Sequence, residues 1–282
     1  MSDRLKIMVQ HMLPKQWLTQ LAGRFARGQH GAMTTALICW FVRRYGVDMR
    51  EADNADIGNY ASFNDFFTRP LKPGVRPLAD ADFVCPVDGA ISQFGAIDNH
   101  HIVQAKNHRF TTMALVGGDA ALAAPFRHGS FANLYLSPRD FHRLLRTIHV
   151  PGALFSVNPV TARGVPGLFA RNERVVCLFE SPGHGPFVMV LVGATIVGSM
   201  ATVWHGLVNP PRGKVVREWL YPVSPDKPEA SIFLKQGEEM GRFLLGSTVV
   251  MLFPNGNLRF NPDWAPGRVV RLGEAMADYV TP

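Results

Sequence analysis

The chain has 282 residues and a net charge of +7, with 47% hydrophobic and 18% charged residues. This composition is too apolar for a disordered chain, and 26 Gly with 21 Pro are too many for an all-helical bundle. The length allows one large domain or two small ones with a substantial core. We therefore expect a β-rich globular protein.

The cysteines and the apolar stretches indicate in which cellular compartment the protein is found. Cys39, Cys85 and Cys177 are far apart and form no Cys-x-x-Cys pair, so we predict neither a disulfide framework nor a metal site. The N-terminal apolar run is broken by Lys6, unlike a signal peptide. The longest apolar stretch, 32–42, is shorter than the roughly 20 residues that span a bilayer. We expect a cytoplasmic protein that does not cross the membrane.

The positive charge is concentrated at the N-terminus. Residues 1–50 carry eight basic and two acidic side chains, a net charge of +6. Pro14 suits a first helical turn, and the apolar residues from Trp17 to Phe25 recur at helical spacing. A second apolar stretch, 33–45, contains Arg43 and Arg44 near its end. Two alternatives stay open: these amphipathic helices lie on an anionic lipid surface, or they pack on the protein's own core.

The rest of the chain is predicted to be mostly strands. Prolines and glycines in 70–77 indicate a linker, and an Asn255-Gly256 pair between apolar runs predicts a hairpin. The strands are expected over 187–192, 194–197, 203–204, 242–253 and 258–260. We predict an α+β fold with an N-terminal helical membrane-association region, 1–65, and a β-rich catalytic domain, 66–282.

Three places in the sequence could carry chemistry, and the first is Asp88. It stands in Pro86-Val-Asp88-Gly89, between two apolar runs. Asp-Gly usually reflects turn chemistry alone, and a catalytic carboxylate is the less common alternative.

The second place is His142. Ser137 can cap a helix and Pro138 fits its first position, so we predict a short helix that begins here. His142 would then lie near the helix N-terminus, where the dipole favours the neutral base form of imidazole. An exposed histidine at a helix start is the alternative.

The third place is the pair Gly246-Ser247, just before the apolar run 249–253. A glycine can turn its carbonyl toward the hydroxyl of the following serine. The common alternative is a polar bend that leads into a strand. Asp88, His142 and Ser247 also form an acid, base and nucleophile set without a Gly-x-Ser-x-Gly elbow, which leaves a serine hydrolase as a rival hypothesis.

At Leu245-Gly-Ser-Thr248 the sequence resembles the phosphatidylserine decarboxylases, specifically the bacterial proenzyme type. The resemblance extends over essentially the whole chain. The other similar blocks, in chain order, are 63–69, 86–89, 136–142, 168–174, 192–199 and 239–243.

The resemblance implies self-cleavage between Gly246 and Ser247. Ser247 would attack the Gly246 carbonyl, and the resulting ester would break by β-elimination into fragments 1–246 and 247–282 that stay together. The cofactor would be pyruvate, a covalent pyruvoyl group formed from Ser247. Asp88 resembles the acid of the self-processing triad, which orients a histidine that activates Ser247.

The resemblance also implies a substrate and a location. Phosphatidylserine in an anionic membrane would form a Schiff base with the pyruvoyl group, lose carbon dioxide and leave as phosphatidylethanolamine. His142 resembles the residue that returns a proton to the α-carbon. The protein would be peripheral on the cytoplasmic face of the cell membrane, a homodimer is a family expectation, and no nucleic-acid partner is expected.

The chain departs from the family pattern after Arg143. The family has a second histidine a few residues beyond, which resembles the triad base, whereas here Arg143 runs directly into Leu144-Leu145. His149 does not take over this role, because 151–158 aligns with the family's next block. We therefore predict that self-cleavage is slow or absent.

Overall fold

The structure is a computed structural model of the chain. It describes residues 3–86, 88–105, 108–134, 142–181, 184–210, 212–221, 231–235, 238–246 and 248–280. For His142 it describes the backbone alone. Ser247 and the predicted helix start at Ser137 and Pro138 lie outside the described residues.

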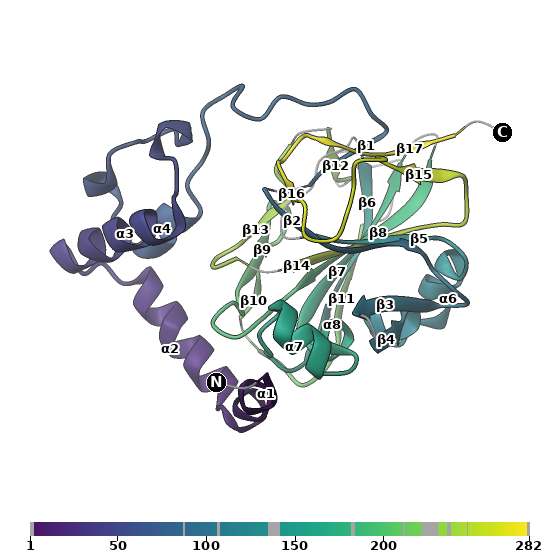
Figure 1. Cartoon of the computed structure of the whole chain (residues 1–282), viewed down its shortest axis with the longest axis horizontal. Helices are drawn as coiled ribbons and strands as arrows, with labels where there is room; N and C mark the ends of the chain where they lie inside the picture. Colours follow the sequence, from purple (N-terminus) through teal and green to yellow (C-terminus); the bar gives the residue numbers. More distant parts are fainter. Residues whose placement is uncertain are drawn as a thin grey trace.

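Three helices form the N-terminal part and lie beside the β-rich body (Figure 1). They are α1 (Asp3–Met12), α2 (Lys15–Arg27) and α3 (Ala32–Tyr45). The predicted helices correspond to α2 and α3. Helix α3 ends at Gly46, whose φ of 64° is the left-handed conformation that glycine adopts at a helix C-terminus. No described helix has the length and apolarity needed to span a bilayer.

A short helix, α4 (Phe63–Phe67), packs on this N-terminal part after two 3₁₀ turns, η1 (Met49–Glu51) and η2 (Ile57–Asn59). It begins with a capping box in which the side chains of Ser62 and Asp65 each accept the other's backbone N–H at 3.1 Å. Phe66 is fully buried, and the ring of Phe41 in α3 lies 5.9 Å from it. An aromatic cluster therefore joins α3 to α4.

The main sheet has nine described strands, paired antiparallel, in the order β11-β6-β7-β8-β14-β5-β2-β16, with β12 also paired to β6. These strands are β2 (Gly89–Ala96), β5 (Ser130–Leu134), β6 (His142–Val150), β7 (Arg174–Ser181), β8 (Gly185–Val192), β11 (Arg217–Leu220), β12 (Phe233–Leu234), β14 (Thr248–Phe253) and β16 (Val269–Val270). Every residue of β14 is buried, and neighbouring strands pair with both of its edges.

Smaller sheets and short helices surround the main sheet (Figure 1). The sheets are β1-β17-β15, β10-β9-β13 and β3-β4. Their strands are β1 (Phe83–Val84), β3 (His101–Ala105), β4 (His108–Thr111), β9 (Met200–Thr202), β10 (Gly206–Asn209), β13 (Gly241–Phe243), β15 (Leu258–Phe260) and β17 (Ala275–Tyr279). The helices are α5 (Thr112–Leu115), α6 (Ala120–Ala123), η3 (Ala124–Phe126), α7 (Pro159–Gly164) and α8 (Leu168–Arg171). The α+β fold class is confirmed.

One large core holds these layers together. Leu115 of α5 and Phe169 of α8 belong to the same buried cluster as the strands of the main sheet. The β1-β17-β15 sheet joins this core through Phe83 of β1, whose ring lies 4.9 Å from that of Phe253 in β14. Most of the largest fully buried side chains are phenylalanines, so aromatic packing dominates this core.

Two of the predicted strands are wrong. Residues 194–197 form an isolated bridge between Ala194 and Val197, where Ile196 has a φ of 63°. A β-branched residue in this conformation does not continue a strand. Residues 203–204 form a turn between β9 and β10, in which Trp204 donates a hydrogen bond to the Thr147 hydroxyl at 3.2 Å.

The predicted hairpin at Asn255-Gly256 is also wrong. The turn joins β14 to β15, but β15 pairs with β17. Because β5 and β8 already occupy both edges of β14, the next strand has to join another sheet. The apolar run that predicted one long strand, 242–253, is divided between β13 and β14.

The predicted linker, 70–77, is held against the N-terminal part. Ala52 forms a bridge with Leu71, and the Lys72 N–H donates to the Glu51 carbonyl at 2.9 Å. The side chain of Arg76 is only 7% exposed. Prolines and glycines shape this segment without making it a loose connection.

Candidate active site

The turn between β13 and β14 holds the predicted cleavage site. Leu244 donates its N–H to the Ser199 carbonyl at 3.0 Å. Leu245 packs against the core of the main sheet and also against the cluster that joins α3 to α4. A Cβ on Gly246 would lie 3.3 Å from Cζ of Phe67, so the glycine allows α4 to approach the turn closely. Ser247 itself lies outside the described residues, and Thr248 begins β14.

The hydroxyl of Thr248 is a buried polar group at this turn. Thr248 is 1% exposed, and its Oγ1 has no hydrogen-bond partner among the residues that the structure describes. Buried hydroxyls are normally hydrogen-bonded, and leaving one unpaired costs about 1 to 3 kcal/mol. The Thr248 hydroxyl, next to Ser247, is therefore available to hydrogen-bond a further polar group at this turn.

The register of the main sheet places Asp88 at the same end as the cleavage turn. Asp88 directly precedes β2, in which Ile91 pairs with Leu134 of β5. Leu134 in turn pairs with Val249 of β14. Since adjacent strands lie about 5 Å apart, β2 and β14 are about 10 Å apart across β5. Asp88 and the turn therefore lie at the same end of the sheet, on two strands that are separated by β5.

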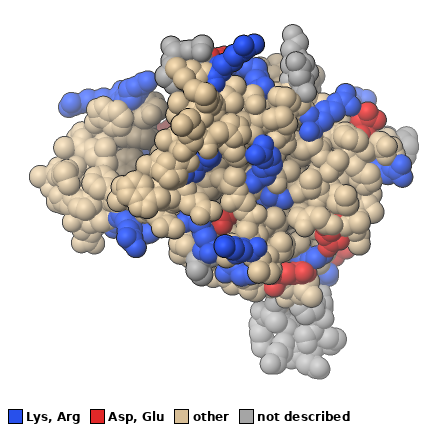
Figure 2. Space-filling view, turned by 90° about the horizontal axis from the view of Figure 1, so that it is seen from below, with Lys and Arg blue, Asp and Glu red and all other residues tan. Residues whose placement is uncertain are grey.

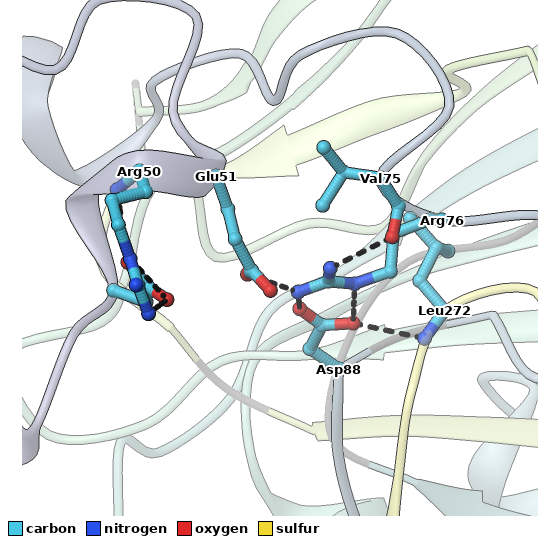
Figure 3. Close-up of polar contacts among 7 residues, drawn as sticks. Arg50, Glu51, Val75, Arg76, Asp88 and Leu272 are labelled. Atoms are coloured by element: carbon cyan, nitrogen blue, oxygen red, sulfur yellow. Dashed lines mark hydrogen bonds and ion pairs between the residues drawn. The ribbon is translucent and has the colours of Figure 1, made fainter.

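Hydrogen bonds fix the carboxylate of Asp88 (Figure 3). Nε of Arg76 lies 2.8 Å from Oδ1, and Nη2 lies 2.5 Å from Oδ2. The backbone N–H of Leu272 also donates to Oδ1 at 2.9 Å. These bonds use three of the carboxylate's about four acceptor positions. Within the described part of the chain one position is left, on a side chain that is 46% exposed.

The environment keeps Asp88 ionised. Partial burial alone would raise its pKa. The hydrogen bonds from Arg76 and Leu272, with the nearby charge of Arg271, outweigh burial and hold the pKa of Asp88 below its ordinary value. At neutral pH the group is therefore a carboxylate that can accept a hydrogen bond.

The predicted helix position of His142 is wrong. His142 is the first residue of β6, and its backbone pairs opposite Leu234 in β12. The residues that follow pair with β7 from Arg143 to Val150, so this apolar segment forms an extended strand.

The register also separates His142 from the cleavage turn. In successive strands Val150 pairs with Arg174, Arg174 with Val192, and Val192 with Thr248. The turn is therefore level with the Val150 end of β6. His142 lies at the other end, roughly 26 Å away along the strand. The structure brings Asp88 to the cleavage turn, but it does not bring the backbone of His142 there.

A buried polar network around His149 was not predicted as a site. His149 is fully buried, and its Nε2 lies 2.9 Å from Oε1 of Glu173. Oε2 of Glu173 accepts a hydrogen bond from Nε of Arg212 at 3.1 Å. Two strands separate β6 from β14, a distance of about 14 Å. His149 therefore does not stand beside the cleavage turn.

Comparison with known families decides the assignment. The phosphatidylserine decarboxylase family model matches residues 63–278, and a second model, described as PSD, matches residues 5–46. The chain belongs to the phosphatidylserine decarboxylase family. It is therefore a decarboxylase, and the matched range includes both Asp88 and the Gly246-Ser247 turn.

Curated members of this family match the chain closely. A phosphatidylserine decarboxylase proenzyme of Variovorax paradoxus is 69% identical over 99% of this chain and 99% of its own length. One of Polaromonas sp. strain JS666 is 67% identical over 99% of this chain and 100% of its own length. This second match extends over 287 residues, more than the 282 of the chain. The Polaromonas protein thus has residues without a counterpart here.

Proposed function

We propose that this chain converts phosphatidylserine to phosphatidylethanolamine at a pyruvoyl group formed from its own Ser247. The family match over 63–278 carries this proposal. The shared sheet end of Asp88 and the cleavage turn supports it.

Self-cleavage would proceed through an ester. The hydroxyl oxygen of Ser247 attacks the Gly246 carbonyl, and the peptide nitrogen leaves with a proton. Loss of the Ser247 α-proton then breaks the bond between Cβ and the ester oxygen and frees the Gly246 carboxylate. Tautomerisation and hydrolysis release ammonia and leave the pyruvoyl group. The ionised Asp88 would stabilise the positive charge of a base that takes the serine proton.

The residues around the turn suit this group. Once formed, a pyruvoyl group supplies a ketone that binds the substrate amine and accepts the electron pair released with carbon dioxide. The Thr248 hydroxyl, which is bound by no residue in the described part of the chain, can donate a hydrogen bond beside it. Leu245 and Phe67 provide an apolar wall that limits access of water. The role of His142 as proton donor stays a prediction.

We also propose that self-cleavage is slow. The sequence lacks the second histidine of the family pattern after Arg143. The match to the Polaromonas relative, which extends over more residues than the chain has, supports a missing internal segment. Without the base, the hydroxyl of Ser247 would lose its proton to a less well placed group.

The N-terminal helices would hold the enzyme on an anionic membrane. Helices α1 to α3 expose apolar side chains, among them Met12, Trp17 and Trp40, which are 77%, 60% and 56% exposed. The face seen from below in Figure 1 carries Lys and Arg widely and few acidic residues (Figure 2). Exposed aromatic and basic side chains together suit a helix at a lipid interface.

Denaturing electrophoresis with intact-mass measurement tests this function. We expect slow conversion of the chain into fragments 1–246 and 247–282, with a blocked N-terminus on the short fragment. Borohydride should then trap phosphatidylserine on that fragment. A chain that stays whole but is labelled at Ser247 by a fluorophosphonate would instead support the serine hydrolase.

A further inference from the structure

The guanidinium of Arg76 lies between two carboxylates from different parts of the chain (Figure 3). Nη2 is 2.5 Å from Oδ2 of Asp88 and 2.7 Å from Oε2 of Glu51. Arg76 is 7% exposed, whereas Asp88 is 46% exposed. The cation is therefore more deeply buried than the carboxylate that it holds.

This contact fixes the direction of the Asp88 carboxylate as well as its charge. Two parallel N–H bonds from one guanidinium set both the distance and the plane of the carboxylate. Without Arg76, the carboxylates of Asp88 and Glu51 would lie near each other without the guanidinium that contacts both, although Arg271 would still act on Asp88. Arg76 thus prevents a repulsion that would favour protonation of Asp88.

Glu51 belongs to the N-terminal part. It is the last residue of η1, and its backbone carbonyl accepts the Lys72 N–H at 2.9 Å. Ala52, the next residue, forms the bridge with Leu71. Glu51 and Arg76 therefore connect the helical N-terminal part to the carboxylate at the end of the main sheet.

We propose that Arg76 is a positioning residue for self-cleavage, which holds the Asp88 carboxylate ionised and oriented toward the cleavage turn. Through Glu51, this placement depends on the docking of the N-terminal part. The inference rests on the proposed function, in which Asp88 is the acid of the self-processing set.

The first test measures the pKa of Asp88 and does not need cleavage. Carbon-13 NMR of the aspartate carboxyl groups is followed against pH in the uncleavable Ser247→Ala chain, with Asp88→Asn to assign the signal. Arg76→Gln should raise the pKa of Asp88, since burial would no longer be offset by the guanidinium. Arg76→Lys keeps the charge and should raise it less. An unchanged pKa in Arg76→Gln would overturn the inference.

The second test follows the rate of self-cleavage against pH with Ser247 intact. Arg76→Gln should slow cleavage on the order of 100-fold. It should also move the acid limb, the low-pH range in which the cleavage rate falls, to higher pH. Arg76→Lys should restore part of the rate and part of the shift. A purely structural role would lower the rate without moving the limb. A parent chain that is never cleaved would overturn the proposed function, and the carboxyl titration would then decide the role of Arg76.

Two controls complete the design. Arg50 makes the same kind of contact with Asp48, but its side chain is 90% exposed, so Arg50→Gln should change neither the pKa of Asp88 nor the rate. Glu51→Gln keeps the contact between Arg76 and Asp88 and should slow cleavage without moving the acid limb. A normal rate in Glu51→Gln would overturn the dependence on docking.

Discussion

At the scale of the residue, Asp88 shows how distant groups set the state of one side chain. Arg76 lies 12 residues before it and Leu272 lies 184 residues after it, yet both bind its carboxylate. The sequence indicated Asp88 as an acid in a turn and, through the family resemblance, as the acid of the self-processing triad. Its partners could not be predicted, because the contact depends on how the C-terminal segment folds back over β2.

Ser247→Ala should give a single uncleaved chain without decarboxylase activity, because the alanine lacks the oxygen that attacks the Gly246 carbonyl. Electrophoresis and a carbon dioxide release assay would measure both effects. Decarboxylation by this variant would show that Ser247 is not the source of the pyruvoyl group.

The cysteines should differ in their reactivity. Burial raises the pKa of the thiols of Cys85 and Cys177 to about 12, and both side chains are fully buried, whereas Cys39 is partly exposed. A thiol reagent should therefore modify Cys39 alone in the native protein and all three cysteines in denaturant. Mass spectrometry would identify the sites, and rapid native labelling of Cys177 would contradict this expectation.

At the scale of the element, the register of β6 decides the position of His142. Strand β5 ends at Leu134, level with the cleavage turn, whereas β6 begins at His142 at the far end of the sheet. The local signals at Ser137 and Pro138 favoured a helix with His142 near its start. Pairing with β7 and β12 places His142 in a strand, because strand contacts between distant segments override local propensity.

Restoring the missing segment should accelerate self-cleavage. We would replace residues 142–151 with the corresponding residues of the Polaromonas relative. If this segment supplies the second histidine, cleavage should be faster by at least about 100-fold, within the range of an added general base. Electrophoresis over time would measure the rate. The same exchange with that histidine changed to alanine is the matched control, and equal rates for both would argue against the role of the base.

At the scale of the whole molecule, the segment proposed to become the short fragment is built into the fold. Its strand β14 lies between β5 and β8, β16 pairs with β2, and β17 pairs with β1. Cleavage at Gly246-Ser247 would therefore cut a turn and leave these sheets intact.

The two fragments should consequently remain together after cleavage. The cleaved fraction should elute in size-exclusion chromatography as one species that contains both fragments, and it should separate in guanidinium chloride. Loss of fragment 247–282 in native buffer would contradict the central position of β14.

The N-terminal part should bind anionic vesicles. Changing Trp17 and Trp40 together to serine should weaken binding by at least about tenfold, since each exposed indole contributes roughly 1.5 kcal/mol or more when it is buried in lipid. Val269→Ser is a matched control, because Val269 is 73% exposed but lies on the β-rich body. Vesicle co-sedimentation would measure binding, and equal losses in both variants would argue against a membrane face on these helices.

The sequence by itself determined the α+β class, the helices α2 and α3, the family and the candidate residues Asp88, Gly246 and Ser247. These features can be predicted from local periodicity, composition and motifs, which are properties of consecutive residues. The tertiary structure alone decided that Asp88 lies at the same sheet end as the turn, that Arg76 binds its carboxylate and also contacts Glu51, and that His142 lies at the other end. Strand order and register arise from contacts between distant segments, so no short stretch of sequence contains them.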